Sequence, residues 1–243
     1  MSKNSTLEMK IFALLLILLL VGWQPRLCLA GQASPEGVIR LGPRLYRLGT
    51  LQIDTHRSTL SFPATVNLAD SMIEYALVST QGKTHESLLK TEVAPRDIHV
   101  ACLLLGVKPS PDRGKPGRTL RTEAGSELDI EVVRISLGGN QTNRLEDWVQ
   151  LAGKDPHATN APFRLGAWAY TGSIMHSGHF IAQEEGSIIS LIRDPAALIN
   201  NPGPDRDNDE IHRTASEKLP PVGTPVTVRF IFKSRRSDAH TTP

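Results

Sequence analysis

The sequence predicts an α+β fold dominated by β-strands, an antiparallel sheet or sandwich with two short helices packed on it. Short segments such as Leu51–Asp54 and Glu127–Ser136 alternate apolar and polar residues, the period of half-buried strands. Glycine and proline clusters separate these segments. Strong helical spacing is rare, and there is no internal repeat, coiled coil or alternation of strands and helices.

The first segment, residues 1–30, is predicted to be a signal peptide. Lysines flank the start of an apolar run over 11–21, and Cys28 and Ala30 supply small side chains at the −3 and −1 positions of a cleavage site. The run is shorter than the roughly 20 apolar residues that span a bilayer. We therefore expect cleavage, export to the periplasm or cell envelope, and no stable membrane span afterwards.

The expected mature chain has no net charge. Cleavage after Ala30 removes three of the 27 basic and one of the 25 acidic residues, leaving 24 of each. This balance gives no sign of a surface for nucleic acid or anionic lipid, so we expect an envelope ligand or protein of unknown identity as partner. Only Cys102 remains, so no internal disulfide is expected and the core must supply stability.

Residues 37–232 are predicted to form one domain, followed by a polar tail over 233–243. Period-2 patterns and apolar runs predict its strands. In chain order these are Val38–Leu41, Arg44–Leu48, Leu51–Asp54, Thr59–Phe62, Met72–Ser79, Glu127–Ser136, Phe163–Tyr170, His179–Gln183, Ser187–Arg193 and Thr224–Phe232. Turns are predicted at Ser177-Gly178 and over 184–186.

The clearest helix is predicted to begin at Pro95. Proline suits the first helical position, Asp97 suits the first turn, and Gly106 follows the last apolar residue as a C-cap. One stripe of this helix is apolar and should be buried: Ile98, Ala101, Cys102 and Leu105.

A second short helix is predicted from Asn143 through Leu151. Asn143 and Glu146 have the spacing of a capping pair, and apolar residues follow them. One or two further helical turns are predicted over 194–199.

The densest polar cluster, Thr84-His85-Glu86-Ser87, directly precedes the first helix. His85 and His99, with Glu86 as third ligand or as a base acting on bound water, would suit a divalent metal. The segment lacks the helical HExxH arrangement, because Leu89 stands where the second histidine is needed. The alternative is that these side chains bind loop backbone and cap the fold.

Two other segments could bind metal. His176 and His179 bracket the turn at Ser177-Gly178 and could chelate, or could be incidental turn residues. Alternating acidic residues over 205–210 could line a calcium loop, although Glu210 stands where an EF-hand has glycine. A polar loop is the alternative there.

Nucleophilic and aromatic residues also leave alternatives open. Cys102 could be a nucleophile or inert packing, and neither Ser87 nor Ser173 lies in the G-x-S-x-G motif of hydrolases. Trp168 and Tyr170 alternate on one strand, as a ligand platform or as sheet core.

Several motifs together resemble those of the bacterial YdjY-type domain. They are Gly82-Lys83 with Thr84–Leu89, Leu105-Gly106, Trp168–Ser173 and Gly186–Leu191. The resemblance covers roughly Gly37 to Phe232 and implies an exported protein, but the function of the family is not established, so it implies no reaction. A ferredoxin-like role, loosely attached to some members, would need about four cysteine ligands, which this chain lacks.

Two classes of function follow. The first is a noncatalytic binding or assembly module of the bacterial cell envelope, with an unknown ligand. The alternative is an exported metal-dependent hydrolase with a site around His85, Glu86 and His99.

Overall fold

The computed structural model describes residues 37–111, 119–122, 125–136, 138–153 and 159–233. The predicted signal peptide over 1–30 lies outside these residues, as does the predicted polar tail after Lys233. Among the described residues, no helix is both long enough and apolar enough to cross a membrane.

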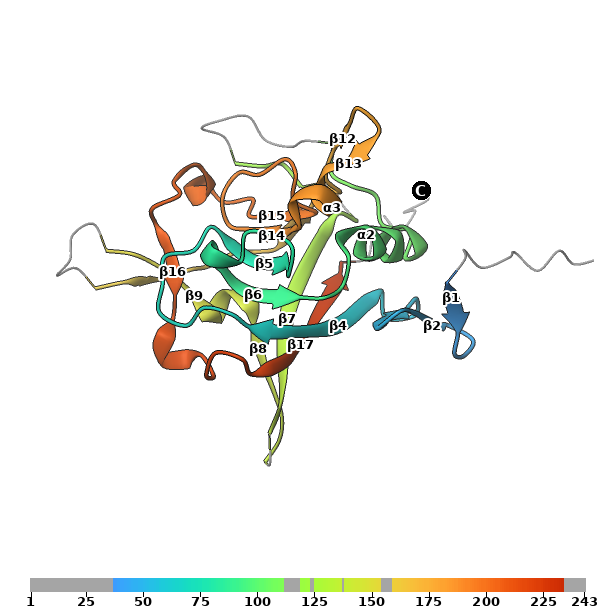
Figure 1. Cartoon of the computed structure of the whole chain (residues 1–243), viewed down its shortest axis with the longest axis horizontal. Coiled ribbons are helices and arrows are strands. Elements are labelled where there is room, and N and C mark those ends of the chain that lie inside the picture. The colour runs from blue at the N-terminus through green and yellow to red at the C-terminus, as the bar shows by residue number, and fades with distance from the viewer. Residues whose placement is uncertain (1–36, 112–118, 123–124, 137, 154–158, 234–243) are drawn as a thin grey trace, which may run out of the picture. The chain divides into compact units, whose positions relative to one another are not determined.

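Eight strands close into a barrel (Figure 1). Around the ring they are β4 (Thr59–Val66), β17 (Pro225–Phe232), β7 (Glu127–Ser136), β11 (Trp168–Tyr170), β15 (Ile199–Asn200), β14 (Ser187–Ser190), β5 (Tyr75–Ser79) and β6 (Ser87–Thr91). The ring closes because β6 pairs with the end of β4 at Thr65 and Val66. The pairs β5–β6 and β14–β15 are parallel, and the other neighbours in the ring are antiparallel.

The prediction of a β-dominated fold with two helices is therefore confirmed. The predicted antiparallel sheet or sandwich matches only in part, because the strands form a closed barrel that contains two parallel pairs. The two parallel pairs are formed by strands joined through short irregular segments, 80–86 and 191–198. Period-2 patterns identify strands but not their partners or directions. No local sequence pattern therefore predicts that the sheet closes into a ring.

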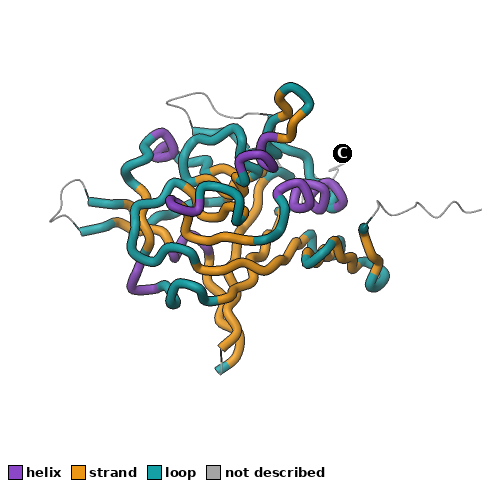
Figure 2. Tube along the Cα trace, viewed as in Figure 1, coloured by secondary structure: helices purple, strands orange, loops and turns teal. Residues whose placement is uncertain are grey.

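One part of the barrel wall continues beyond the ring as an open antiparallel sheet. The strand β3 (Leu51–Asp54) pairs with the first half of β4 on the edge that β6 occupies further along. Outward from β3 lie β2 (Leu45–Leu48) and β1 (Val38–Arg40), while β8 (Gly139–Arg144) extends β7 at the other side. Figure 2 shows the β7–β8 hairpin projecting away from the barrel.

The two faces of this wall differ sharply. Along β4 and β17 buried and partly exposed residues alternate, so Leu60, Phe62, Val228 and Phe230 point inward. Phe62 and Phe230 meet edge to face with ring centroids 5.2 Å apart. An eight-stranded barrel is just wide enough for side chains to fill, and the inward residues fill this one. The residues between them, most of which are polar, form the outer face.

The predicted first helix is confirmed as α2 (Pro95–Leu104), with Pro95 at its start and Ile98, Ala101 and Cys102 buried. The second helix is α3 (Ile181–Glu185), within a segment predicted as strand and turn. α2 contacts α3 and β3, and so covers the inner side of the sheet extension.

The helix predicted over 143–151 is wrong. Strand β8 runs to Arg144, the 3₁₀ helix η2 (Leu145–Trp148) follows, and then the strand β9 (Val149–Leu151). Strand pairing overrides the capping signal, and the Glu146 carboxylate accepts hydrogen bonds from Trp168 and Arg144 instead of capping a helix. The turns predicted over 194–199 are also not helical, because Asp194 closes a turn onto Ala196 and the chain then enters β15.

Two small sheets and three more 3₁₀ helices complete the described residues. The strands β9, β10 (Ala161–Pro162) and β16 (His212–Thr214) pair together, and β12 (Met175–His176) pairs with β13 (His179–Phe180). The predicted turn at Ser177-Gly178 is confirmed, with φ of 50° and 83°, as a tight hairpin turn requires. The 3₁₀ helices are η1 (Thr84–Glu86), η3 (Pro204–Asp207) and η4 (Ser216–Lys218).

Candidate functional site

The predicted cluster Thr84-His85-Glu86-Ser87 forms η1 and the start of β6. The Asn67 side-chain amide ties both ends of this turn, donating to Thr84 O at 2.6 Å and Ser87 O at 2.8 Å. His85 Nε2 lies 3.7 Å from Glu86 Oε2, and His85 is exposed. The Ser87 hydroxyl is buried and donates to Leu89 O at 2.7 Å, which makes it a structural group.

His99, the third predicted ligand, has different neighbours. Its Nδ1 lies 2.8 Å from Tyr170 Oη, and the Phe180 ring packs on it with centroids 4.9 Å apart. Burial lowers the pKa of His99. On the same helix Cys102 is fully buried, and burial raises the pKa of its thiol, which favours the packing interpretation over a nucleophile.

The structure thus brings His85 and Glu86 together and holds His99 in a separate aromatic environment. Among the described residues, no group of three or more His, Cys, Asp and Glu side chains is arranged to hold a metal ion. The predicted three-ligand site stays a prediction, and metal analysis of purified protein tests it directly.

Next to η1 lies a chain of polar contacts that no motif in the sequence predicts. Lys83 Nζ donates to Tyr75 Oη at 2.9 Å, and Tyr75 Oη donates to Asp194 Oδ2 at 3.1 Å. Burial, then the neighbouring Glu86 charge, raises the pKa of Glu74. Partly buried groups with raised pKa values are candidates for proton transfer, although structural networks produce them too.

Two glycines position Lys83. A Cβ on Gly82 would lie 2.9 Å from Glu185 O, and one on Gly186 would lie 2.6 Å from Gly82 Cα. The two backbones therefore meet where no side chain fits. These glycines belong to two of the motifs that carry the family resemblance.

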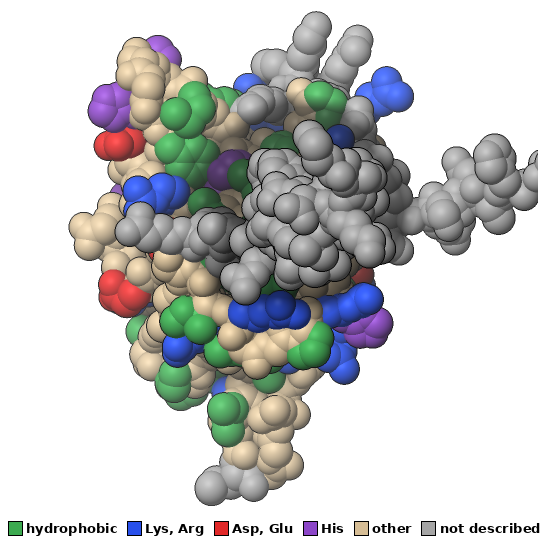
Figure 3. Space-filling model, turned by 90° about the vertical axis from the view of Figure 1, so that its right-hand side faces the viewer, with side chains coloured by type: hydrophobic (Ala, Val, Ile, Leu, Met, Phe, Trp, Pro, Cys, Tyr) green, Lys and Arg blue, Asp and Glu red, His purple; other side chains and the backbone are tan. Residues whose placement is uncertain are grey.

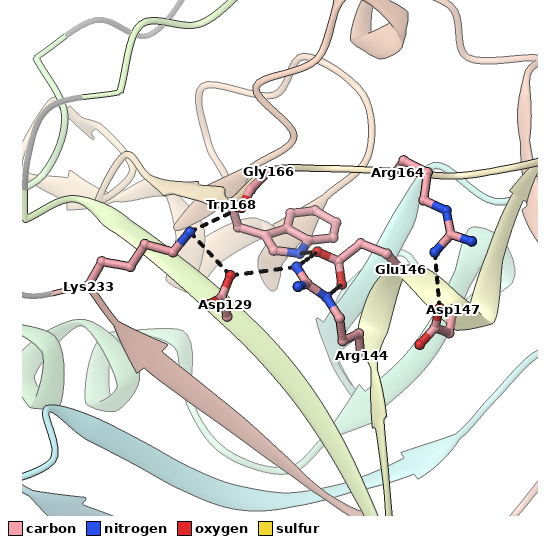
Figure 4. Close-up of polar contacts among 8 residues, drawn as sticks. All are labelled: Asp129, Arg144, Glu146, Asp147, Arg164, Gly166, Trp168 and Lys233. Carbon is pink, nitrogen blue, oxygen red and sulfur yellow. Dashed lines mark hydrogen bonds and ion pairs between the residues drawn. The ribbon is translucent and has the colours of Figure 1, made fainter.

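A second polar network surrounds Glu146, which is 3% exposed (Figure 4). Its Oε1 accepts hydrogen bonds from Trp168 Nε1 and Arg144 Nη2, both at 3.1 Å. Asp129 lies between Arg144 and Lys233, at 3.6 and 3.4 Å. Trp168 is completely buried, as is Tyr170, so the sheet-core alternative holds for both aromatic residues.

The acidic segment over 205–210 is partly engaged within the fold. Asp205 Oδ2 lies 2.6 Å from Nε2 of the fully buried His212, and it also accepts a hydrogen bond from Asn201 Nδ2 at 2.9 Å. Burial raises the pKa of Asp205, but these hydrogen bonds outweigh burial and leave it lowered. Asp207 pairs with Arg193 at 2.6 Å. Both carboxylates therefore stabilise the fold, which favours the polar-loop alternative over a calcium loop.

The turn histidines are surface groups. His176 and His179 are exposed, and His179 Nδ1 lies 3.3 Å from Glu184 Oε1. Figure 3 shows histidine side chains at the upper left and at the lower right of the face that it draws, and several basic side chains gathered below its centre beside hydrophobic ones.

A depression of about 510 Å³ lies on the outer face of the open sheet, within the roughly 300–1,000 Å³ typical of ligand pockets. We call it the outer-face depression. Its lining residues come from β2, β3, β4, β17, β7 and the β3–β4 turn: Leu45, Gln52, Asp54, Arg57, Thr59, Ser61, Glu131, Arg229 and Ile231. The lining contains no histidine, cysteine or lysine.

Strand register sets the order of side chains within the depression. Gln52 lies opposite Ser61, Ser61 opposite Arg229, and Arg229 opposite Glu131, so these four form one row across neighbouring strands. Arg229 Nη1 contacts Glu131 Oε2 at 3.1 Å. At the turn, Arg57 contacts Asp54 at 3.0 Å, and hydrogen bonds, chiefly from the Arg57 backbone, lower the pKa of Asp54.

Sequence reasoning missed this depression. Each residue in it looked like the solvent face of an ordinary strand, and only the pairing of strands far apart in the sequence gathers them. The alternation along Leu51–Asp54 and Thr59–Phe62 predicts half-buried strands with one polar face, but not which other strands lie beside that face. Thr224–Phe232 is predicted only as a buried strand.

The fold and this surface define a closed, mixed β-barrel domain whose open sheet extension carries a polar depression on its outer face. The chain belongs to the YdjY domain family, because the family's model matches residues 51–231. The resemblance stated from the motifs is thereby confirmed. Searches of curated proteins and of solved structures gave no match.

Proposed function

We propose that this protein is a noncatalytic binding or assembly module of the bacterial cell envelope, and that the outer-face depression is its ligand surface. The single observation that carries the proposal is the depression itself. It offers hydrogen-bonding side chains on rigid, register-locked strands, and it lacks the histidine, cysteine and lysine side chains that most often act as nucleophiles or bases near neutral pH.

The candidate nucleophiles elsewhere support binding over catalysis. Cys102 is buried with a raised pKa, and the buried Ser87 hydroxyl is held by Leu89 O. Ser173 is buried as well, and its Oγ accepts a hydrogen bond from Ala182 N at 3.0 Å. None of these three groups is presented to a substrate in solvent.

Cosedimentation of the purified protein with a bacterial envelope fraction containing membranes and peptidoglycan tests the proposal. We expect binding by the wild type and at least a fivefold loss in Arg229→Ala, which removes a central donor of the depression. Arg96→Ala, at an exposed arginine of α2, is the matched control and should bind normally. The proposal fails if the wild type does not cosediment, or if both variants bind equally well.

The second candidate, an exported metal-dependent hydrolase, would need His85, Glu86 and His99 to share one ion. Only the contact between His85 and Glu86 speaks for it, while His99 is engaged by Tyr170 and Phe180.

A further inference from the structure

We infer that the outer-face depression takes a neutral, hydroxyl-rich chain, an oligosaccharide in chemical class, lying across the strands. This inference rests on the proposed binding function and adds the kind of ligand. It follows from the charges in the depression, from its unused hydrogen-bonding groups and from their arrangement in a row.

The charges are already paired. Arg229 is matched by Glu131 at 3.1 Å and Arg57 by Asp54 at 3.0 Å, so two positive and two negative side chains cancel. Asp54 Oδ1 also accepts the backbone N–H groups of His56 and Arg57, at 2.9 and 3.0 Å. An ionic ligand would meet no net opposite charge and would have to compete with an existing partner.

The uncharged polar groups, by contrast, are available. The side chains of Gln52, Thr59 and Ser61 make no hydrogen bond to another described residue. An amide and two hydroxyls offer both donors and acceptors, and Arg229 has further N–H groups beyond the one that meets Glu131. A ligand hydroxyl also donates and accepts hydrogen bonds, so a polyhydroxylated molecule can pair with both the donors and the acceptors of the depression. An anion pairs only with the donors, and a cation only with the acceptors.

The arrangement favours a chain over a single small ring. Gln52, Ser61, Arg229 and Glu131 stand on four neighbouring strands, and a strand spacing of 4.7–4.9 Å makes this row about 14 Å long. Leu45 and Ile231 add apolar surface on which the C–H face of a sugar ring could pack. The depression is open to solvent, so each added unit should strengthen an individually weak contact.

Backbone amide chemical shifts of the isotope-labelled protein test the inference. The probes are N-acetylglucosamine, its β-1,4-linked trimer, inorganic phosphate and spermidine. We expect the trimer to shift amides of β3, β4 and β17, with a Kd at least fivefold below that of the monomer and unchanged when salt is raised. Gln52→Ala combined with Ser61→Ala should weaken trimer binding at least fivefold, with Gln81→Ala, at an exposed loop glutamine, as the control.

The outcomes separate this inference from the function on which it rests. If phosphate or spermidine shifts these amides in a salt-sensitive way and neither saccharide does, the inferred ligand class is wrong, and this result does not bear on the proposed binding function. If neither saccharide shifts them, the inference is overturned whatever the other probes do. If the trimer binds no better than the monomer, the inference that the ligand is a chain lying across several strands is wrong. The envelope cosedimentation assay alone decides the proposed function.

Discussion

Two Arg–Glu pairs of equal length occupy very different surroundings in this barrel. Arg144 meets Glu146 at 3.1 Å with the carboxylate side chain 3% exposed, whereas Arg229 meets Glu131 at 3.1 Å with the carboxylate side chain 28% exposed. The first carboxylate is also fixed by the Trp168 indole, while the second lies in an open depression beside unused hydroxyls. The chemistry of the pair is the same, so burial decides whether it only stabilises the fold or also stays accessible, where the further N–H groups of Arg229 can meet a ligand.

The largest expected effect concerns the buried pair. Glu146→Ala leaves the buried Trp168 Nε1–H without its acceptor and opens a small cavity, so we expect a loss of roughly 2–4 kcal/mol in the free energy of unfolding. Glu131→Ala, at the exposed pair, should cost less than about 1 kcal/mol. Urea denaturation of both variants measures the difference. Equal losses would show that burial does not cause the two ion pairs to contribute differently to stability.

A partly buried carboxylate, with a side chain 17% exposed, sharpens the comparison through pH. Asp205 is held ionised by His212 and Asn201, so its pKa in the folded protein lies below its value in the unfolded chain, near 3.9. Its contribution is then fully present above that unfolded value and is lost as pH falls through the folded pKa. At pH 5 we expect Asp205→Asn to be less stable than wild type by roughly 1.5–3 kcal/mol, the range for hydrogen bonds to a charged group.

The difference between wild type and Asp205→Asn should shrink as pH falls from about 5 to about 2, measured by thermal unfolding at each pH. Asp70→Asn is a suitable control, because Asp70 makes an exposed ion pair with Arg213 and should show little such dependence. A difference that persists unchanged at the acid end would show that Asp205 acts through packing and not through its charge.

Which elements can be predicted from the sequence depends on whether their signals are local or come from partners distant in the chain. Strands β3 and β4 can be predicted because one face of each is buried and the other is polar, which gives the sequence a period of two. Strand β17 is predicted as a buried strand from its apolar residues. Strand β6 was missed, because Leu88 and Leu89 are both buried and give no alternation. The helix α2 was predicted from its end residues, which depend only on local conformation.

The candidate site could not be predicted in this way. The row from Gln52 to Glu131 exists only because β4 and β7 both pair with β17, although the three strands lie far apart in the chain. His85 and Glu86 lie together because they are neighbours in sequence, whereas grouping His99 with them assumes that α2 begins near η1 and faces it. The helix instead presents His99 to Tyr170 of β11 and to Phe180, strand partners that no spacing along the chain reveals.

The smallest expected effect concerns the most exposed pair. His85 and Glu86 lie 3.7 Å apart, with the histidine side chain 79% exposed, so His85→Ala should change the free energy of unfolding by less than about 0.5 kcal/mol. Elemental analysis of the purified wild type should find no stoichiometric zinc or other divalent metal, because one ion would need His99 to leave Tyr170 and Phe180. One bound metal per chain, lost in both His85→Ala and His99→Ala but retained in His176→Ala, would contradict this. That result would favour the hypothesis of a metal-dependent hydrolase, since the imidazoles of His85 and His99 would then have to bind a single ion.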